Sequence, residues 1–154
     1  RQKIRAHGRE MIDYYQELAL EFPICSIEDP LDEEDWDGWE LLTTRLGGEI
    51  QLGRGRLVRD EYKTFKAGIE RNVANAILVK VNQIGTLTEA IEAIELAQKS
   101  GYRAIVSHRS GETEDTTIAD LRWRLTPGRS RRRACRGERV AKYNQLLRIA
   151  ETLE

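Results

Sequence analysis

Short apolar runs and helical patterns alternate along this chain, and this alternation restricts the fold more than any other feature of the sequence. The apolar runs predict strands at residues 22–27, 49–52, 76–81 and 103–106. Apolar residues at helical spacing predict helices at residues 11–20, 35–46, 61–72, 87–100, 116–125 and 138–153. A strand followed by a helix, repeated at intervals of roughly 25 to 30 residues, is typical of βαβ units and a parallel sheet.

Two of the predicted helices carry start signals. Acids crowd the first turn of the helix at 35–46, where the helix dipole favours negative charge. Thr86 is followed three residues later by Glu89, which predicts a capping box, and Gly101 lies just past the end of that helix.

The length of the chain limits which parallel architecture it can form. Its 154 residues suffice for one domain with a usable core. An eight-stranded (β/α) barrel takes about 250 residues, so the chain could supply about half of one. A half barrel would leave two strand edges open, which favours aggregation. The pattern alone leaves both a doubly wound sheet and part of a barrel open. Because the chain starts at Arg1 and its only methionine is Met11, we expect a piece of a longer protein.

Charge is balanced overall but unevenly distributed, with 25 Lys and Arg against 26 Asp and Glu. Residues 17–40 hold ten acids and no Lys or Arg, whereas residues 122–139 hold eight arginines and one acid, Glu138. Such blocks are usually solvated faces or interaction tails, and the basic one leaves nucleic-acid binding open as an alternative. Trp123 is the only aromatic residue in the basic block, which counts against base stacking.

Cysteine usage and hydropathy bear on the compartment. Cys25 and Cys135 show neither metal-ligand spacing nor a disulfide framework, which favours a reducing compartment. The sequence has no run of 18 apolar residues, so we expect no membrane span. No charged-then-apolar leader opens it, and we expect a cytoplasmic protein.

Polar residues follow the predicted strands, where parallel α/β folds place their active sites. Glu28 and Asp29 follow the first strand, Lys80 lies inside the apolar run 76–81, and a polar segment at 107–110 follows the last strand. A carboxylate, a lysine and a His-Arg-Ser cluster suit an anionic, metal-bound substrate. The alternatives are a surface loop for the Arg-Ser pair and a lysine on an edge strand whose ammonium reaches solvent.

Four longer motifs resemble those of the enolase family of phosphopyruvate hydratases. They are Ser-Ile-Glu-Asp-Pro at 26–30, Leu-Val-Lys-Val-Asn-Gln-Ile-Gly-Thr at 78–86, Val-Ser-His-Arg-Ser-Gly-Glu-Thr-Glu-Asp at 106–115 and Glu-Arg-Val-Ala-Lys-Tyr-Asn-Gln-Leu-Leu-Arg at 138–148. The resemblance runs from about Glu10 to the C-terminus. It implies that residues 1–154 are the second half of an enolase-type (β/α)8 TIM barrel, without the N-terminal domain and the first barrel strands.

The resemblance also implies a reaction and roles for individual residues. The family reaction is the Mg²⁺-dependent, reversible dehydration of 2-phosphoglycerate to phosphoenolpyruvate in glycolysis, and the family is typically homodimeric. Lys80 matches the base that removes the C2 proton, and Glu28 matches a ligand of the Mg²⁺ that holds the substrate carboxylate. His108 matches a histidine of the substrate pocket. Arg109 and Ser110 match the phosphate-binding pair, with Ser110 also near a second Mg²⁺. The divalent cations would stabilise a dianionic intermediate.

Two stretches depart from the family pattern. Where the family reads close to Val-Gly-Asp-Asp-Leu, residues 53–57 read Gly-Arg-Gly-Arg-Leu, so Gly55 stands in place of a Mg²⁺-binding aspartate. Where the family reads close to Gly-Gln-Ile-Lys-Thr-Gly, residues 128–133 read Gly-Arg-Ser-Arg-Arg-Arg, and the substrate-binding lysine falls on Arg131. The family's general-acid glutamate and first metal-binding aspartate would lie upstream of Arg1.

A shifted reading frame accounts for both departures. Family-like codons for Val-Gly-Asp-Asp-Leu-Phe-Val-Thr-Asn-Thr-Lys, read with one extra G in front, encode residues 53–63 without a mismatch. Codons for Ala-Val-Ala-Leu-Asn-Ala-Gly-Gln-Ile-Lys-Thr-Gly, read one base later, encode residues 122–132. Our hypothesis is that both segments are frame-shifted enolase, from a gene that has decayed or was misread. Residues 1–9 also depart from the family, and a frame shift does not account for them.

These departures predict an enolase-derived chain that is itself inactive. Loss of the aspartate at Gly55 should abolish productive Mg²⁺ binding. We also expect poor packing, because Arg122 and Arg124 interrupt an apolar helix face, and Arg54 and Arg56 place charge at a strand end. The alternative functions are a non-catalytic binding protein and, less favoured, an arginine-rich nucleic-acid-binding module.

Overall fold

The computed structural model describes residues 8–55, 61–125 and 136–153, apart from the side chains of residues 61–64. Its strands form one sheet in the order β1-β2-β3-β4, and every neighbouring pair is parallel. The strands are β1 (Ser26–Glu28), β2 (Gln51–Arg54), β3 (Ala76–Val79) and β4 (Arg103–Val106). The helices are α1 (Gly8–Glu21), α2 (Trp36–Leu46), α3 (Glu61–Glu70), α4 (Val81–Ile84), α5 (Leu87–Lys99), α6 (Thr117–Leu125) and α7 (Gly137–Glu151). The expected parallel α/β fold is confirmed.

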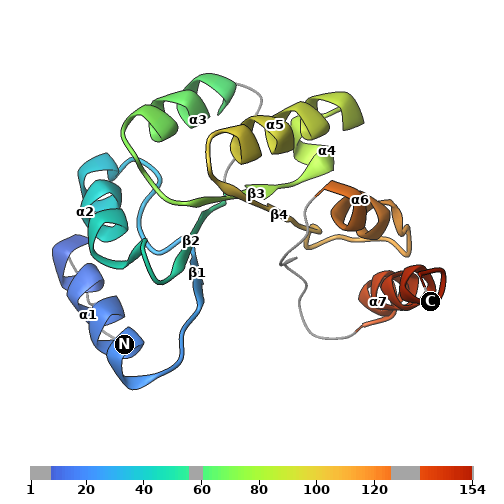
Figure 1. The fold of residues 1–154 in the computed structure, drawn as a ribbon, viewed down its shortest axis with the longest axis horizontal. Helices are drawn as coiled ribbons and strands as arrows, with labels where there is room; N and C mark the ends of the chain where they lie inside the picture. The colour runs from blue at the N-terminus through green and yellow to red at the C-terminus, as the bar shows by residue number, and fades with distance from the viewer. Residues whose placement is uncertain (1–7, 56–60, 126–135, 154) are drawn as a thin grey trace.

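The helices form an arc around the sheet, from α1 at one end to α6 and α7 at the other (Figure 1). Most buried residues lie between this arc and the sheet, among them Trp39 and Leu42 of α2, Val79 of β3 and Ile94 of α5. Ala76, Leu78 and Ile105 form a second, smaller cluster. Because successive strand residues point to opposite faces, these three belong to the other face of the sheet.

The capping signals in the sequence correspond to observed helix starts. Asp35 precedes α2 and accepts a hydrogen bond from Gly38 N at 2.9 Å. Thr86 precedes α5, where its hydroxyl accepts a bond from Glu89 N at 3.2 Å and donates to Glu89 Oε2 at 2.7 Å. The first bond is the N-cap half of the predicted capping box, whereas the second joins the Glu89 carboxylate to the Thr86 hydroxyl rather than to the backbone N–H that a full capping box uses.

Three strand predictions need correction. The strand predicted at 49–52 is displaced by two residues, because β2 spans Gln51–Arg54. The run at 22–27 is a strand only from Ser26, because Ile24 N bonds to Phe22 O at 2.7 Å and Pro23 has no N–H for a ladder. Lys80 is not inside a strand. β3 ends at Val79, and Lys80 is the N-cap of α4, where its carbonyl accepts from Gln83 N at 2.8 Å.

The expected poor packing at Arg54 is wrong. Its guanidinium lies 4.2 Å from the centre of the Trp36 ring and 5.9 Å from that of Trp39. One of its nitrogens donates to Glu33 O at 2.6 Å. Cation–π contact and a carbonyl acceptor therefore compensate this charge at the end of β2. Arg56 lies outside the described residues.

α6 forms despite its arginines, and its buried residues are Ala119 and Leu121. Arg122 is partly buried and Arg124 is exposed. The expectation of an interrupted apolar face is met only at Arg122. None of the helices in the described part of the chain is long and apolar enough to cross a membrane.

Candidate functional site at the carboxyl ends of the strands

The parallel sheet brings several of the predicted site residues to one edge. Glu28 is the last residue of β1 and pairs in register with Gly53 of β2. Its Cγ lies 3.4 Å from where a Cβ on Gly53 would be, so the side chain covers that glycine. Lys80 directly follows β3, and Val79 pairs with Val106 of β4, so Lys80 is level with the polar segment that begins at Ser107.

Lys80 reaches across the sheet to the end of β2. Its ammonium donates a hydrogen bond to the carbonyl oxygen of Gly55, 25 residues earlier in the chain. The side chain is half-buried, so the alternative of a lysine that reaches solvent from an edge strand does not hold. Two positions that the sequence analysis singled out, Lys80 and Gly55, are thus in direct contact.

Asp29 also belongs to this edge, although the sequence analysis gave it no role. Its Oδ1 accepts a hydrogen bond from Gly55 N at 2.6 Å, and its own N–H donates to Gly53 O at 2.9 Å. Its φ of 50° is in the left-handed region, which is uncommon for a residue with a side chain. A Cβ on Gly55 would lie 2.3 Å from Asp29 Oδ2, so the Asp29 carboxylate fills the space beside Gly55.

The arrangement around Gly55 does not fit a Mg²⁺ site. Among the described residues no three His, Cys, Asp or Glu side chains are grouped so that they could hold a metal ion. The carboxylate nearest Gly55, that of Asp29, already accepts a backbone N–H there, and the Lys80 ammonium is bonded to the adjacent carbonyl. A positive charge and an N–H donor at this position oppose a cation, which takes oxygen ligands.

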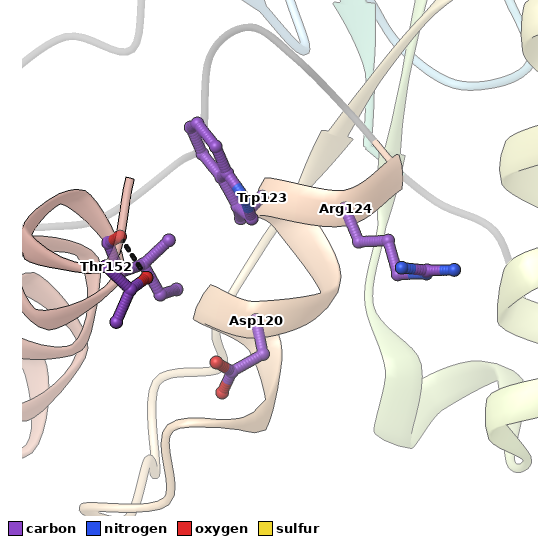
Figure 2. A pocket seen from close by; sticks show the side chains of 5 residues that line it. Asp120, Trp123, Arg124 and Thr152 are labelled. Carbon is purple, nitrogen blue, oxygen red and sulfur yellow. Dashed lines mark hydrogen bonds between the residues drawn. The ribbon is translucent and has the colours of Figure 1, made fainter. Parts of the chain in front are cut away.

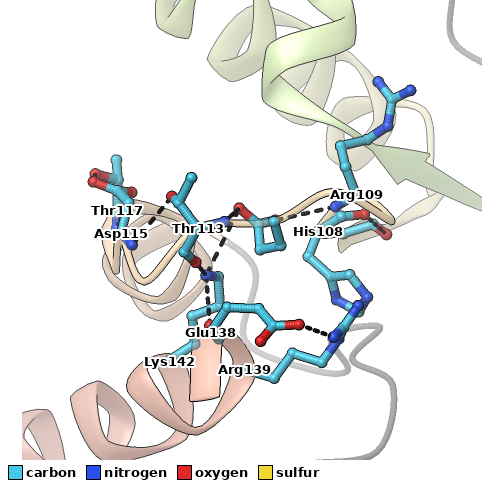
Figure 3. Close-up of polar contacts among 10 residues, drawn as sticks. His108, Arg109, Thr113, Asp115, Thr117, Glu138, Arg139 and Lys142 are labelled. Carbon is cyan, nitrogen blue, oxygen red and sulfur yellow. Dashed lines mark hydrogen bonds and ion pairs between the residues drawn. The ribbon is translucent and has the colours of Figure 1, made fainter. Parts of the chain in front are cut away.

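The segment after β4 divides into a buried and an exposed part. Ser107 and His108 are buried, at 4% and 7% exposure, whereas Arg109 and Ser110 are exposed. Figure 3 shows the side chains of His108 and Arg109 extending in opposite directions from the backbone. The segment therefore offers an exposed guanidinium and hydroxyl, with the imidazole turned inward.

Glu112 fixes the backbone of this segment. Its carboxylate accepts hydrogen bonds from Arg109 N and Thr113 N, both at 3.1 Å. We call residues 107–113 the β4 loop. The sequence analysis gave Glu112 no function, and it has no local signal because its role depends on how the loop folds back on itself.

The first turns of α7 hold two buried cations beside the β4 loop. Lys142 is fully buried and donates to Thr113 O at 2.7 Å and to Glu138 O at 2.9 Å. Arg139 is 4% exposed and is paired with the Glu138 carboxylate. In Figure 3 its guanidinium points toward the His108 ring.

Glu138 is the acid of this cluster. A hydrogen bond to its own backbone N–H at the start of α7 lowers its pKa, and the positive charges of Arg139, Arg136 and Lys142 lower it further. The helix dipole also favours a negative charge, such as that of the Glu138 carboxylate, near the start of a helix. Because Arg139 is buried, it cannot belong to an exposed basic surface of the kind that binds nucleic acid. Arg131, the other predicted substrate-binding residue, lies outside the described residues.

A separate cavity lies between α6 and α7. It has a volume of about 560 Å³ and is lined by Asp120, Trp123, Arg124, Ile149 and Thr152 (Figure 2). None of the predicted site residues that the structure describes lines it, so we do not associate it with the groups at the strand ends.

Polar groups at the carboxyl ends of parallel strands occur in both doubly wound and barrel folds, whereas strands that lie in chain order with the helices in an arc around them (Figure 1) are typical of the barrel class. Comparison with known proteins agrees and is more specific. Residues 2–154 match the family model described as the enolase C-terminal TIM barrel domain, and the chain belongs to that family. The match starts earlier than the expected limit near Glu10 and includes both arginine-rich segments.

Two relatives show how much of the whole protein this chain represents. It is 61% identical over 145 residues to an enolase of Rubrobacter xylanophilus, covering 94% of this chain and 34% of the relative. It is 54% identical over 146 residues to an enolase of Acidothermus cellulolyticus, with the same coverage of 94% and 34%. The chain thus spans about a third of the length of these relatives.

Proposed function

We propose that this chain carries part of an enolase active site and binds the phosphorylated three-carbon acid of that reaction without dehydrating it. The contact between Lys80 and Gly55 supports the proposal most directly, because it joins the two strand ends that the family motifs assign to proton removal and to metal binding. Here the first of these residues is present, whereas the second lacks its carboxylate.

We call the full-length enolase to which such a chain would belong the parent enzyme. Its reaction is the Mg²⁺-dependent dehydration of 2-phosphoglycerate to phosphoenolpyruvate. In the parent enzyme Lys80 would take the C2 proton, His108 would line the pocket, and Arg109 and Ser110 would bind the phosphate. A lysine acts as a base only when it is neutral. In this chain the Lys80 Nζ donates to Gly55 O, the backbone of the position that lacks its carboxylate. Loss of the metal carboxylate therefore argues for an inactive chain.

The wider properties of the parent are part of the same proposal. We place residues 1–154 as a partial barrel domain, and the parent as a cytoplasmic homodimer that uses Mg²⁺. Glu28 would be a metal ligand there, and the residue at position 131 would contact substrate. For this chain the donor set around Gly55 argues against Mg²⁺, so its ligand binding should not depend on the metal.

Binding of phosphoenolpyruvate, measured by isothermal titration calorimetry with and without Mg²⁺, tests the proposal. Arg109→Ala removes the exposed guanidinium after β4 and should weaken binding about tenfold, the size of one lost charge-assisted hydrogen bond. Arg103→Ala is the matched control, because Arg103 is an exposed arginine at the opposite end of the same strand. It should leave binding unchanged.

Four outcomes would contradict parts of this proposal. Conversion of 2-phosphoglycerate in the presence of Mg²⁺ would disprove the inactivity. Affinity that rises with Mg²⁺ would show that the metal site is intact. Equal effects of the two arginine substitutions, or no binding at all, would reject the phosphate site and favour a binding protein of another kind.

A further inference from the structure

Lys142, the buried lysine of α7, has no role in the proposed function. It nevertheless contacts the β4 loop, on which the proposed function depends. Lys142 has a side-chain exposure of 1%, and its Nζ lies 3.8 Å from Glu112 Oε1. A buried ammonium is stable only if acceptors surround it. Here the acceptors are two backbone carbonyls, those of Thr113 and Glu138, and the Glu112 carboxylate.

Glu112 links this ammonium to the phosphate-binding segment. One of its oxygens faces Lys142 and accepts Thr113 N, while the other accepts Arg109 N. The carboxylate is partly buried, with 17% exposure, so the attraction between the two charges is less screened than on the surface. The path from α7 to the backbone of Arg109 thus consists of one ion pair and one hydrogen bond.

The two residues lie 30 positions apart in sequence and on different elements. Figure 3 shows Lys142 rising from α7 toward Thr113 of the β4 loop. Gln145, which donates to Asp120 Oδ1 of α6 at 2.7 Å, is a second tie of α7 but does not reach the loop. Lys142 therefore connects the β4 loop to α7.

We propose that Lys142, acting through Glu112, is a positioning residue that holds the β4 loop in the conformation needed to bind phosphate. The inference rests on the proposed function, in which Arg109 and Ser110 contact that group. Lys142 itself does not touch the ligand. Its effect on affinity should come from the loop conformation, since the Arg109 side chain is exposed and, within the described part of the chain, the residue is held through its backbone N–H.

Two variants of the full chain test this, with inorganic phosphate as the probe. Lys142→Met removes the ammonium, and Glu112→Gln removes the charge of its partner while keeping the size of the side chain. Each should speed hydrogen exchange at the amides of Arg109 and Thr113 about tenfold and weaken phosphate binding by a similar factor, as expected for a lost hydrogen bond to a charged group. Lys99→Met is the matched control, because Lys99 is an exposed lysine paired with Glu95 on α5.

The double variant separates positioning from a merely structural role. If the two residues act in one path, combining Lys142→Met with Glu112→Gln should weaken phosphate binding little more than either change alone. Additive effects, or exchange at Arg109 and Thr113 that matches the Lys99 control, would overturn the inference. If Lys142→Met fails to fold, the Glu112→Gln exchange rates decide the question.

The proposed function can be wrong even if the positioning role of Lys142 is right, and the same measurements distinguish the two. Faster exchange at Arg109 in both variants, together with no phosphate binding by the unaltered chain, would uphold the positioning role and reject the phosphate site.

Discussion

Asn75 shows how one polar side chain can secure several backbone segments. Its Oδ1 accepts Leu52 N at 2.7 Å, and its Nδ2 donates to Gly47 O at 2.7 Å and to Ile50 O at 2.9 Å. The amide lies directly before β3 and connects it to the turn between α2 and β2. It thereby sets the relative position of two strands whose carboxyl ends carry Gly55 and Lys80.

Replacing Asn75 should be among the more destabilising single changes in the chain. Asn75→Ala leaves three backbone groups without their partner, which we expect to lower the free energy of unfolding by about 3 kcal/mol. Chemical denaturation measures the change. Asn144→Ala is the control, since Asn144 is exposed on α7, and it should alter stability by less than about 0.5 kcal/mol. Equal effects of the two changes would show that the Asn75 contacts carry no net stability.

Residue types alone do not reveal such roles. The strand-end residues Glu28 and His108 could be picked out from the sequence because each comes within two residues of the end of an apolar run. Asn75, Glu112 and Lys142 could not, because their partners lie on other elements or depend on how a loop turns. The conformation of Asp29, with φ 50°, is likewise set by its bonds to β2 rather than by its neighbours in sequence.

At the scale of the element, α7 depends on charge more than on an apolar face. Its buried residues are Arg139 and Lys142, whereas Tyr143 and Leu147 are exposed. A surface helix usually buries an apolar stripe instead. The ionised form of Glu138 compensates the positive charges in the first two turns, so the stability of α7 should depend on pH.

Acid should loosen α7 before the rest of the molecule. The pKa of Glu138 is lowered in the folded chain, so the carboxylate contributes stability above its unfolded pKa, and this contribution is lost as pH falls through the lowered value. Hydrogen exchange of the α7 amides, followed from about pH 6 to about pH 3, should show this loss, and Glu138→Gln should remove it. Glu151→Gln, at the exposed end of the same helix, should leave the pH profile intact.

A pH profile of hydrogen exchange that is the same for Glu138→Gln and for the unaltered chain would show that another group controls the acid response.

The capped helices α2 and α5 differ from α7 in how they begin. Asp35 and Thr86 begin α2 and α5 through hydrogen bonds within one turn, so their starts could be predicted from the sequence, whereas no side-chain cap bond forms at Arg136 before α7.

At the scale of the whole molecule, the sheet has two buried faces of unequal size. The larger cluster lies under the helices, and the smaller one consists of Ala76, Leu78 and Ile105. Burial on both faces is typical of parallel sheets, whose strands are near-continuous apolar runs. β3, with all four residues buried, shows this most clearly.

The two arginine-rich segments also concern the whole chain, because they decide whether its parent is a working enzyme. The frame-shift hypothesis predicts that the source DNA encodes Gly-Asp-Asp near position 55 and Gln-Ile-Lys near position 131 in a neighbouring frame. Sequencing across both segments checks this, and mass spectrometry of peptides covering residues 47–66 and 119–139 shows which version the cell makes. An uninterrupted arginine-coding frame with clean reads would contradict the hypothesis. The contacts of Arg54 with Trp36 and Glu33 show only that the fold can accommodate one of these arginines.

The sequence by itself determined the order of strands and helices apart from the short α4, the parallel class of the sheet and the edge at which polar groups gather. These follow from apolar periodicity and from residues that come directly after a strand, both of which are local properties of the chain. Only the tertiary structure decided that Lys80 lies just after β3 and reaches Gly55, that Asp29 fills the space beside that glycine, and that Lys142 lies against Glu112. Each of these contacts joins residues about 25 to 30 positions apart, and the packing of successive βα units brings them together.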